Sequence, residues 1–125
     1  MPDDIVNGAV SAEAAQRAVE FLVEISPDLR GAAILAADGS VLAASNDSGR
    51  WGEDAAALFD VADEAGPGPV EQVHIGTEQG EVFGIRHADL LAVAVTDRFA
   101  LASLILFDLR ALLRDLAAGG DGKVE

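Results

Sequence analysis

The sequence contains no cysteine in its 125 residues, which excludes a disulfide framework and a thiolate metal site. Aromatic side chains are also few, at 5% of the chain, whereas hydrophobic residues make up 50%. The core must therefore be assembled from alanine, valine, leucine and isoleucine, with a few phenylalanines and one tryptophan. A chain of this length and composition is typical of one globular domain.

Positive charge is the second shortage, because 8 Lys and Arg residues stand against 22 Asp and Glu residues and give a net charge of −14. Such a chain repels the phosphates of nucleic acids and the anionic surface of a membrane. It has no apolar run of membrane-spanning length, and its first ten residues lack the basic start and apolar centre of a signal peptide. These absences predict a cytoplasmic protein with protein partners, no nucleic-acid partner and no membrane insertion.

The spacing of apolar residues predicts three helices, over 12–25, 51–65 and 98–118. Ser11 caps the first and Pro27 ends it, while the second stops at a Gly-Pro-Gly-Pro sequence. Thr96 or Asp97 caps the third, which closes at Gly119. Because the middle of the third helix is apolar almost all round, we expect it to be buried between the sheet and a neighbour or to form an oligomer interface.

The stretch "GAAILAADGSVLAAS", residues 31–45, predicts a β-hairpin, because Asp38-Gly39 between two apolar runs favours a two-residue type I′ turn. With Ala37 opposite Ser40, both faces of the hairpin are apolar. The two sets of side chains are Ala33, Leu35, Leu42 and Ala44 on one face, and Ala32, Ile34, Ala36, Val41 and Ala43 on the other. Such a sheet must be covered on both sides by helices or by another chain.

Three further strands follow closely, over 70–77, 81–87 and 90–96, at the spacing of an antiparallel meander. The third, "LLAVAVT", is a continuous apolar run expected for a central strand, whereas the first, "VEQVHIGT", alternates and fits a half-exposed strand near an edge. We expect a domain over 11–118, preceded by a flexible segment over 1–10 and followed by a disordered tail over 119–125.

Residues that could carry chemistry are sparse. His74 and His87, the only histidines, could form a metal site or an acid–base pair with Asp89. Zinc needs three or four convergent ligands, and these residues offer no regular ligand spacing. Asp38 could belong to a catalytic carboxylate pair, but a hairpin corner is the favoured interpretation. With no G-x-S-x-G motif and no phosphate loop, no catalytic residue, metal ligand or cofactor is predicted.

Three pieces of the sequence, in their order and spacing, together resemble the roadblock/dynein light chain family: "GAAILAADGSVLAAS", "FGIRHADLLAVAVTD" and "LILFDLRALLRDL". The resemblance spans Ser11 to Ala118 and is closest to small stand-alone bacterial members, including the Mgl-type regulators of polarity GTPases. It implies an α+β fold of order α-β-β-α-β-β-β-α, as in roadblock and profilin-like domains. In that fold a five-stranded antiparallel sheet lies in a three-layer α/β/α arrangement, with the first and last helices on one face and the middle helix on the other.

The resemblance also implies a homodimer. In it the third strand of the domain, over 70–77, pairs with the same strand of a second subunit to give one ten-stranded sheet, and the middle helices lie side by side. The implied interface residues are Trp51, Ala55, Leu58, Phe59 and Ala62 in the middle helix and Val70, Gln72, Val73, His74 and Ile75 in the third strand. Pairing of this kind removes the liability of an unpaired strand edge.

Members of the family have no catalytic residues of their own and serve as platforms for small Ras-like GTPases. The resemblance therefore implies a non-enzymatic dimeric module that regulates or scaffolds such a GTPase. The acidic face of the middle helix is the expected partner-binding surface, made of Glu53, Asp54, Asp60 and Asp63. Arg50 is the only basic residue close to that helix, and no arginine finger is assigned to it. The alternative is a sensory domain of the PAS or profilin-like type, which would enclose a small molecule among a few convergent polar groups.

Overall fold

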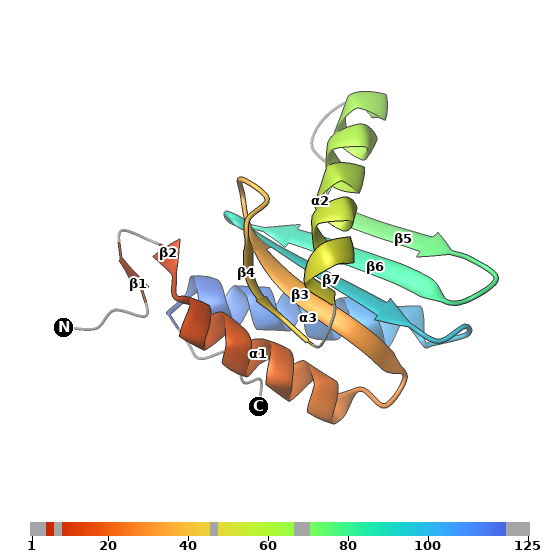
Figure 1. Cartoon of the computed structure of the whole chain (residues 1–125), viewed down its shortest axis with the longest axis horizontal. Coiled ribbons are helices and arrows are strands. Elements are labelled where there is room, and N and C mark those ends of the chain that lie inside the picture. Colours follow the sequence, from red (N-terminus) through yellow and green to blue (C-terminus); the bar gives the residue numbers. More distant parts are fainter. Residues whose placement is uncertain (1–4, 7–8, 46–47, 67–70, 120–125) are drawn as a thin grey trace.

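The computed structural model describes residues 5–6, 9–45, 48–66 and 71–119, which form a five-stranded antiparallel sheet with helices on both faces (Figure 1). The helices are α1 (Ala12–Ile25), α2 (Ser48–Ala65) and α3 (Ala102–Ala117). The strands of the sheet are β3 (Leu29–Ala36), β4 (Val41–Ala44), β5 (Gln72–Gly76), β6 (Glu81–His87) and β7 (Leu90–Thr96). A separate pair, β1 (Ile5–Val6) with β2 (Ala9–Val10), precedes α1 within the segment predicted to be flexible.

The sheet has the order β4-β3-β7-β6-β5, so β7 is central and β4 and β5 are the edges. Helices α1 and α3 lie on one face and α2 on the other (Figure 1). The predicted fold class and three-layer arrangement are therefore confirmed. The central place of "LLAVAVT" and the edge place of β5 are confirmed as well.

Alternate residues of each strand face opposite sides, so the sheet supports two cores of unequal size. The larger core, on the α1 and α3 side, includes Phe83, Ile85 and Leu109. The smaller core, on the α2 side, consists of Ala33, Leu35, Phe59, Leu91 and Val93. Among the described side chains of α2, Phe59 is the one that is buried, so this residue largely fixes the helix on the sheet.

The turn of the β3–β4 hairpin differs from the prediction. Gly39 has a positive φ of 91°, but Asp38 does not, so the predicted type I′ turn is wrong. Gly39 N donates to the Ala36 carbonyl at 2.9 Å, and Ala36 N donates to the Ser40 carbonyl at 2.9 Å. These bonds enclose a three-residue loop that ends in a left-handed glycine, a common alternative to the two-residue turn.

A β-bulge follows this loop, because the pairing moves from Ile34–Ala43 to Leu35–Val41 and leaves Leu42 as an extra residue. The extra residue shifts the alternation of side chains by one. Leu42 therefore packs on the α1 and α3 side and Val41 on the α2 side, the reverse of the predicted faces.

The ends of α1 follow the prediction closely. Ser11 Oγ accepts a hydrogen bond from Ala14 N at 3.1 Å, which confirms the predicted cap.

The other two helices differ from the prediction at their starts. Helix α2 begins at Ser48, three residues before the predicted start. Gly119 follows α3 as the predicted closing glycine, and its φ is 93°. None of the described helices is both long and apolar enough to cross a bilayer.

The start of α3 was predicted wrongly. The helix begins at Ala102, with Leu101 in the cap position, and neither Thr96 nor Asp97 caps it. Thr96 is the last residue of β7, and Asp97 Oδ1 lies 2.6 Å from Arg30 Nε on β3. Both predicted cap residues therefore lie at the strand end, several residues before the helix.

Candidate protein-interaction site

The outer side of β5 presents backbone groups to solvent. In its pairing with β6, Thr77 N donates to the Gly80 carbonyl at 2.8 Å. Only alternate residues of an antiparallel strand bond to the same neighbour, so the odd-numbered residues of β5 bond to β6. The N–H and C=O groups of Gln72, His74 and Gly76 therefore point away from the sheet, where they can pair with another strand.

The even-numbered side chains of β5 are tied to the α1 and α3 side. The His74 ring stacks on Phe83 with a centroid distance of 4.4 Å, and its Nε2 lies 2.5 Å from Glu81 Oε1. Gln72 Oε1 accepts a hydrogen bond from Arg110 of α3 at 2.8 Å. These contacts tie β5 to β6 and α3 on that side of the sheet.

The opposite face of β5 is apolar and only partly covered by the described residues. Val73 and Ile75 are half-buried there, and so is the neighbouring Val82 of β6. Within the described part of the chain, α2 packs mainly on β3 and β4 rather than on β5 (Figure 1). This edge thus combines outward backbone groups with an apolar surface.

Phe59 belongs to the predicted interface but is also needed by the fold of a single chain. It is 2% exposed and packs against Gly84, where an added Cβ would lie 2.6 Å from the Phe59 ring. The Arg86 guanidinium lies 4.8 Å from the ring centroid and donates to Asp63 Oδ2 at 2.9 Å. Phe59 and Asp63 therefore anchor α2, and their role in an interface stays a prediction.

The other predicted residues of α2 differ in how far the structure describes them. Leu58 and Ala62 are half-buried, and Asp54 and Asp60 are exposed. The predicted residues that lie outside the described residues are Val70 and the side chains of Arg50, Trp51, Glu53 and Ala55.

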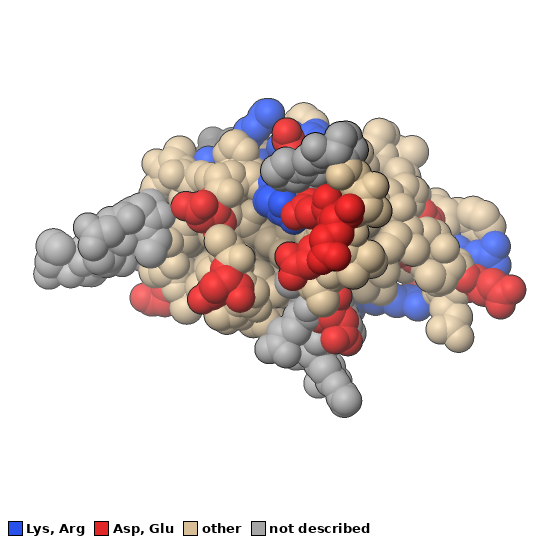
Figure 2. Space-filling view, turned by 90° about the horizontal axis from the view of Figure 1, so that it is seen from above, with Lys and Arg blue, Asp and Glu red and all other residues tan. Residues whose placement is uncertain are grey.

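The outer side of α2 is acidic. Asp54, Asp60 and Glu64 are exposed, and Asp63 is half-buried. Figure 2 shows Asp and Glu side chains gathered on the face of the molecule that is seen from above. A cluster of like charges attracts a basic protein surface and repels nucleotide phosphates.

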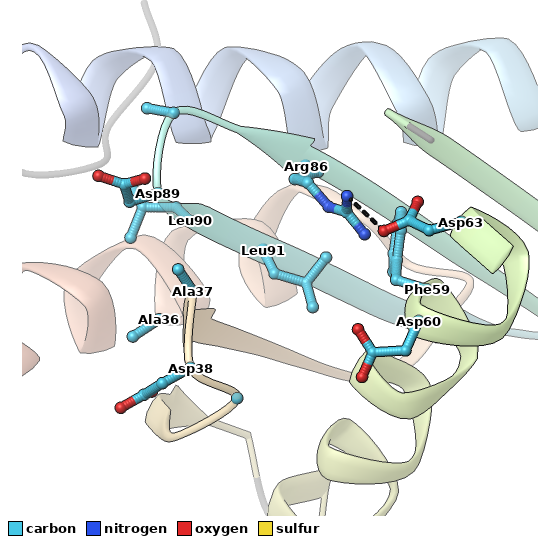
Figure 3. Close-up of a pocket in the computed structure, with 12 residues that line it drawn as sticks. Ala36, Ala37, Asp38, Phe59, Asp60, Asp63, Arg86, Asp89, Leu90 and Leu91 are labelled. Atoms are coloured by element: carbon cyan, nitrogen blue, oxygen red, sulfur yellow. Dashed lines mark hydrogen bonds and ion pairs between the residues drawn. The ribbon is translucent and has the colours of Figure 1, made fainter. Parts of the chain in front are cut away.

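A hollow of about 320 Å³ lies beside α2, between the β3–β4 turn and the β6–β7 turn (Figure 3). Its lining combines apolar Phe59, Leu90 and Leu91 with charged Asp38, Asp60, Asp63, Arg86 and Asp89. The two turns meet because Ala36 of β3 pairs with Leu90 of β7. Sequence reasoning missed this hollow, since its walls come from three segments that are distant in the chain.

Asp38 acts as a turn residue. Its Oδ1 accepts hydrogen bonds from Ser40 Oγ at 2.7 Å and from Ser40 N at 2.9 Å. These bonds, first from the side chain and then from the backbone of Ser40, lower the pKa of the Asp38 carboxyl. A carboxylate with a lowered pKa is a weak base at neutral pH, which supports the hairpin-corner interpretation over catalysis.

The two histidines lie apart on the sheet. His74 is opposite Phe83, so His87 lies four residues further along β6. That separation is about 13 Å at the usual rise of a strand. In the ranges that the structure describes, no group of three or more His, Asp or Glu side chains is arranged to hold a metal ion.

No protein-family model and no curated protein matches the sequence, but solved structures share the fold. A Roadblock/LC7 domain from Streptomyces avermitilis has a TM-score of 0.70 at 20% identity, over 82% of this chain and 93% of that one. MglB in a tetrameric arrangement has a TM-score of 0.69 at 18% identity, over 95% and 98%. A profilin from Schizosaccharomyces pombe has 0.60 at 18% identity, over 84% and 97%. The chain therefore has the roadblock and profilin-like fold.

Proposed function

We propose that this chain is a non-enzymatic homodimeric module that binds a small Ras-like GTPase and regulates or scaffolds it. The fold shared with Roadblock/LC7 domains and MglB supports this function, as does the resemblance of the sequence to a family that serves such GTPases. The observation that carries the proposal is the β5 edge, where outward backbone groups adjoin half-buried Val73 and Ile75.

The dimer forms by pairing of two β5 strands around a two-fold axis. In such a ladder the outward groups of Gln72, His74 and Gly76 bond to the same strand of the second copy. Val73 and Ile75 of both copies then meet on the α2 side, where mutual contact completes their burial. The joined sheet brings two acidic α2 helices to one face and concentrates negative charge there.

The GTPase contacts this acidic face through a basic surface of its own. Asp54 and Asp60 are exposed and can attract such a surface, with a contribution that salt screens. Arg86, an arginine on the same face, is held by Asp63 and Phe59, so we assign it no role on the nucleotide.

Light scattering on the purified chain tests the dimer, and a strict monomer at micromolar concentration would exclude strand pairing. Co-purification from native extract with GTP or GDP tests the partner. Recovery of a small GTPase whose hydrolysis or exchange rate changes is the expected result. Asp60→Lys should weaken that binding about tenfold, whereas Glu24→Lys on the opposite face of the sheet should not. Equal effects of the two variants would contradict the acidic contact.

The hollow favours a second candidate function, a sensory domain that binds a small molecule. Its volume of about 320 Å³ is near the lower end of ligand sites, which span about 300–1,000 Å³. This function predicts a metabolite that co-purifies with the wild-type protein and is lost in Ala37→Phe, which fills the mouth of the hollow. Mass spectrometry of the denatured protein decides between the two, since retention of a GTPase without a metabolite excludes the sensor.

A further inference from the structure

The first half of α3 and the short segment before it carry large apolar side chains that are exposed to solvent. Four large side chains, here called the α3 ridge, are exposed: Phe99 (84%), Leu101 (65%), Leu104 (52%) and Phe107 (62%). From Leu101 onward they recur every third residue, so they are neighbours on the helix surface. Because α3 and α2 lie on opposite faces of the sheet, the ridge is separate from the acidic surface of α2.

The backbone of Phe99 is held in place, although its side chain is the most exposed of the four. Its φ of 66° lies in the left-handed region, which a bulky residue rarely adopts. Its N–H donates to Glu81 Oε2 at 2.8 Å, and the Arg98 guanidinium lies 4.7 Å from its ring centroid. Glu81 is fixed in turn by His74. An aromatic side chain has few rotatable bonds, so it loses little conformational entropy when a partner covers it, which suits an interface anchor.

Within residues 98–117 the exposed charged side chains are basic, and the exposed Asp97 just before them is paired with Arg30. Between residues 98 and 117, Arg98 and Arg114 are exposed, whereas Asp108 and Asp115 are half-buried. Burial also raises the pKa of Asp108. Arg114 lies beyond the other end of the ridge, whereas the Arg110 guanidinium donates to Gln72 Oε1 of β5 at 2.8 Å. In a chain with 22 acidic and 8 basic residues, this clustering favours an acidic partner.

We propose that the α3 ridge is a second docking surface, which binds an amphipathic helix of another protein whose apolar stripe is flanked by Asp or Glu. Phe99 and Phe107 pack between the apolar side chains of that helix, and Arg98 and Arg114 pair with its acidic flanks. A helix is the fitting occupant, because a ridge at three-residue spacing packs into the groove between rows of side chains on a second helix. The module then holds two partners, one on each face of the sheet.

A phage-displayed library of helical peptides tests the proposal, with one apolar stripe and either Glu or Lys at each flanking position. Selection on the full-length protein should yield Glu-flanked peptides that bind Phe99→Ser and Phe107→Ser at least tenfold more weakly. Val61→Ser, at a site 63% exposed on α2, is the matched control and should bind them like the wild type. The double variant Arg98→Glu, Arg114→Glu should select Lys-flanked peptides. Lys-flanked peptides on the wild type, or equal binding to Phe107→Ser, would overturn the proposal.

Light scattering on the same variants separates docking of another protein from self-association. Phe99→Ser and Phe107→Ser remove exposed side chains, so the oligomeric state and the urea midpoint should match those of the wild type. If either variant changes the oligomeric state, the ridge is a contact between copies of this chain and the proposed occupant is wrong.

Discussion

One edge strand, β4, has four residues, a bulge at Leu42 and contacts with both α1 and α2. The other, β5, has five residues in unbroken register with β6, and its Val73 and Ile75 stay half-buried although Val73 packs against the core under α2. Bulges and covering helices discourage strand pairing, whereas a regular and half-covered edge invites it. The comparison makes β5 the edge on which the proposed dimer pairs.

The largest expected effect comes from removing the side chain that holds α2 on the sheet. Phe59→Ala deletes the ring that fills the space above Gly84 and should lower the free energy of unfolding by about 3–5 kcal/mol. Urea denaturation measures this loss, with Val61→Ala as a control expected to change the free energy by less than about 0.5 kcal/mol. A loss below about 1 kcal/mol for Phe59→Ala would mean that other contacts hold α2.

A matched pair of prolines compares the two edges directly. Gly76 N–H points outward from β5, and Ala44 N–H points outward from β4, because Ser45 N donates inward to the Ala32 carbonyl at 2.9 Å. Gly76→Pro removes two symmetry-related hydrogen bonds from the proposed dimer, which at about 1 kcal/mol each weakens it roughly 10- to 100-fold. Ala44→Pro should leave the dimer intact.

Analytical ultracentrifugation over a dilution series measures the dissociation constants of both proline variants. Equal weakening of the dimer by the two prolines, or weakening by Ala44→Pro alone, would exclude β5 as the pairing edge. Circular dichroism of both variants checks that the fold is retained.

The smallest effect concerns the hydrogen-bonded pair of His74 and Glu81 on β5 and β6. The hydrogen bond from His74, more than that from the Phe99 backbone, lowers the pKa of Glu81 from an ordinary value of 4.5. A carboxyl with a lowered folded pKa contributes stability above its unfolded pKa and loses it as the pH falls through the folded value. Below pH 4.5 the wild type should therefore lose stability more steeply than Glu81→Gln.

Urea midpoints measured from neutral to acidic pH test this slope. Glu78→Gln, at an exposed site in the β5–β6 turn, is the control and should follow the wild type. Parallel curves for the wild type and Glu81→Gln would show that the pair does not stabilise the edge.

The burial order of the sheet was predictable because the strands differ in pattern. The apolar run of β7 requires cover on both faces, and the alternation of β5 allows only half. The bulge in β4 could not be predicted, since "VLAA" is apolar throughout and nothing in it distinguishes the two faces. The start of α3 was missed because the Asp97 carboxylate binds Arg30, which is 67 residues away in the chain.

The candidate surfaces were predictable to different degrees. The edge position of Gln72 and Val73 followed from strand alternation. The apolar circumference of α3 predicted burial between the sheet and a neighbour or an oligomer interface, and four large side chains in and just before this helix are exposed in the single chain. The backbone position of Phe99 depends on Glu81, and the hollow depends on two turns that meet across the sheet. Contacts between distant segments of this kind have no local sequence pattern.

The Glu81 carboxylate binds His74 with one oxygen and the Phe99 N–H with the other. In spectroscopic terms, the Phe99 amide proton is a native reporter: bonded to a carboxylate, it should resonate downfield and exchange slowly for a loop position. A strand that docks on β5 and displaces His74 would alter that one resonance, as would a helix that covers the Phe99 ring. A single nuclear magnetic resonance signal can therefore register occupancy of both surfaces without any label attached to the chain.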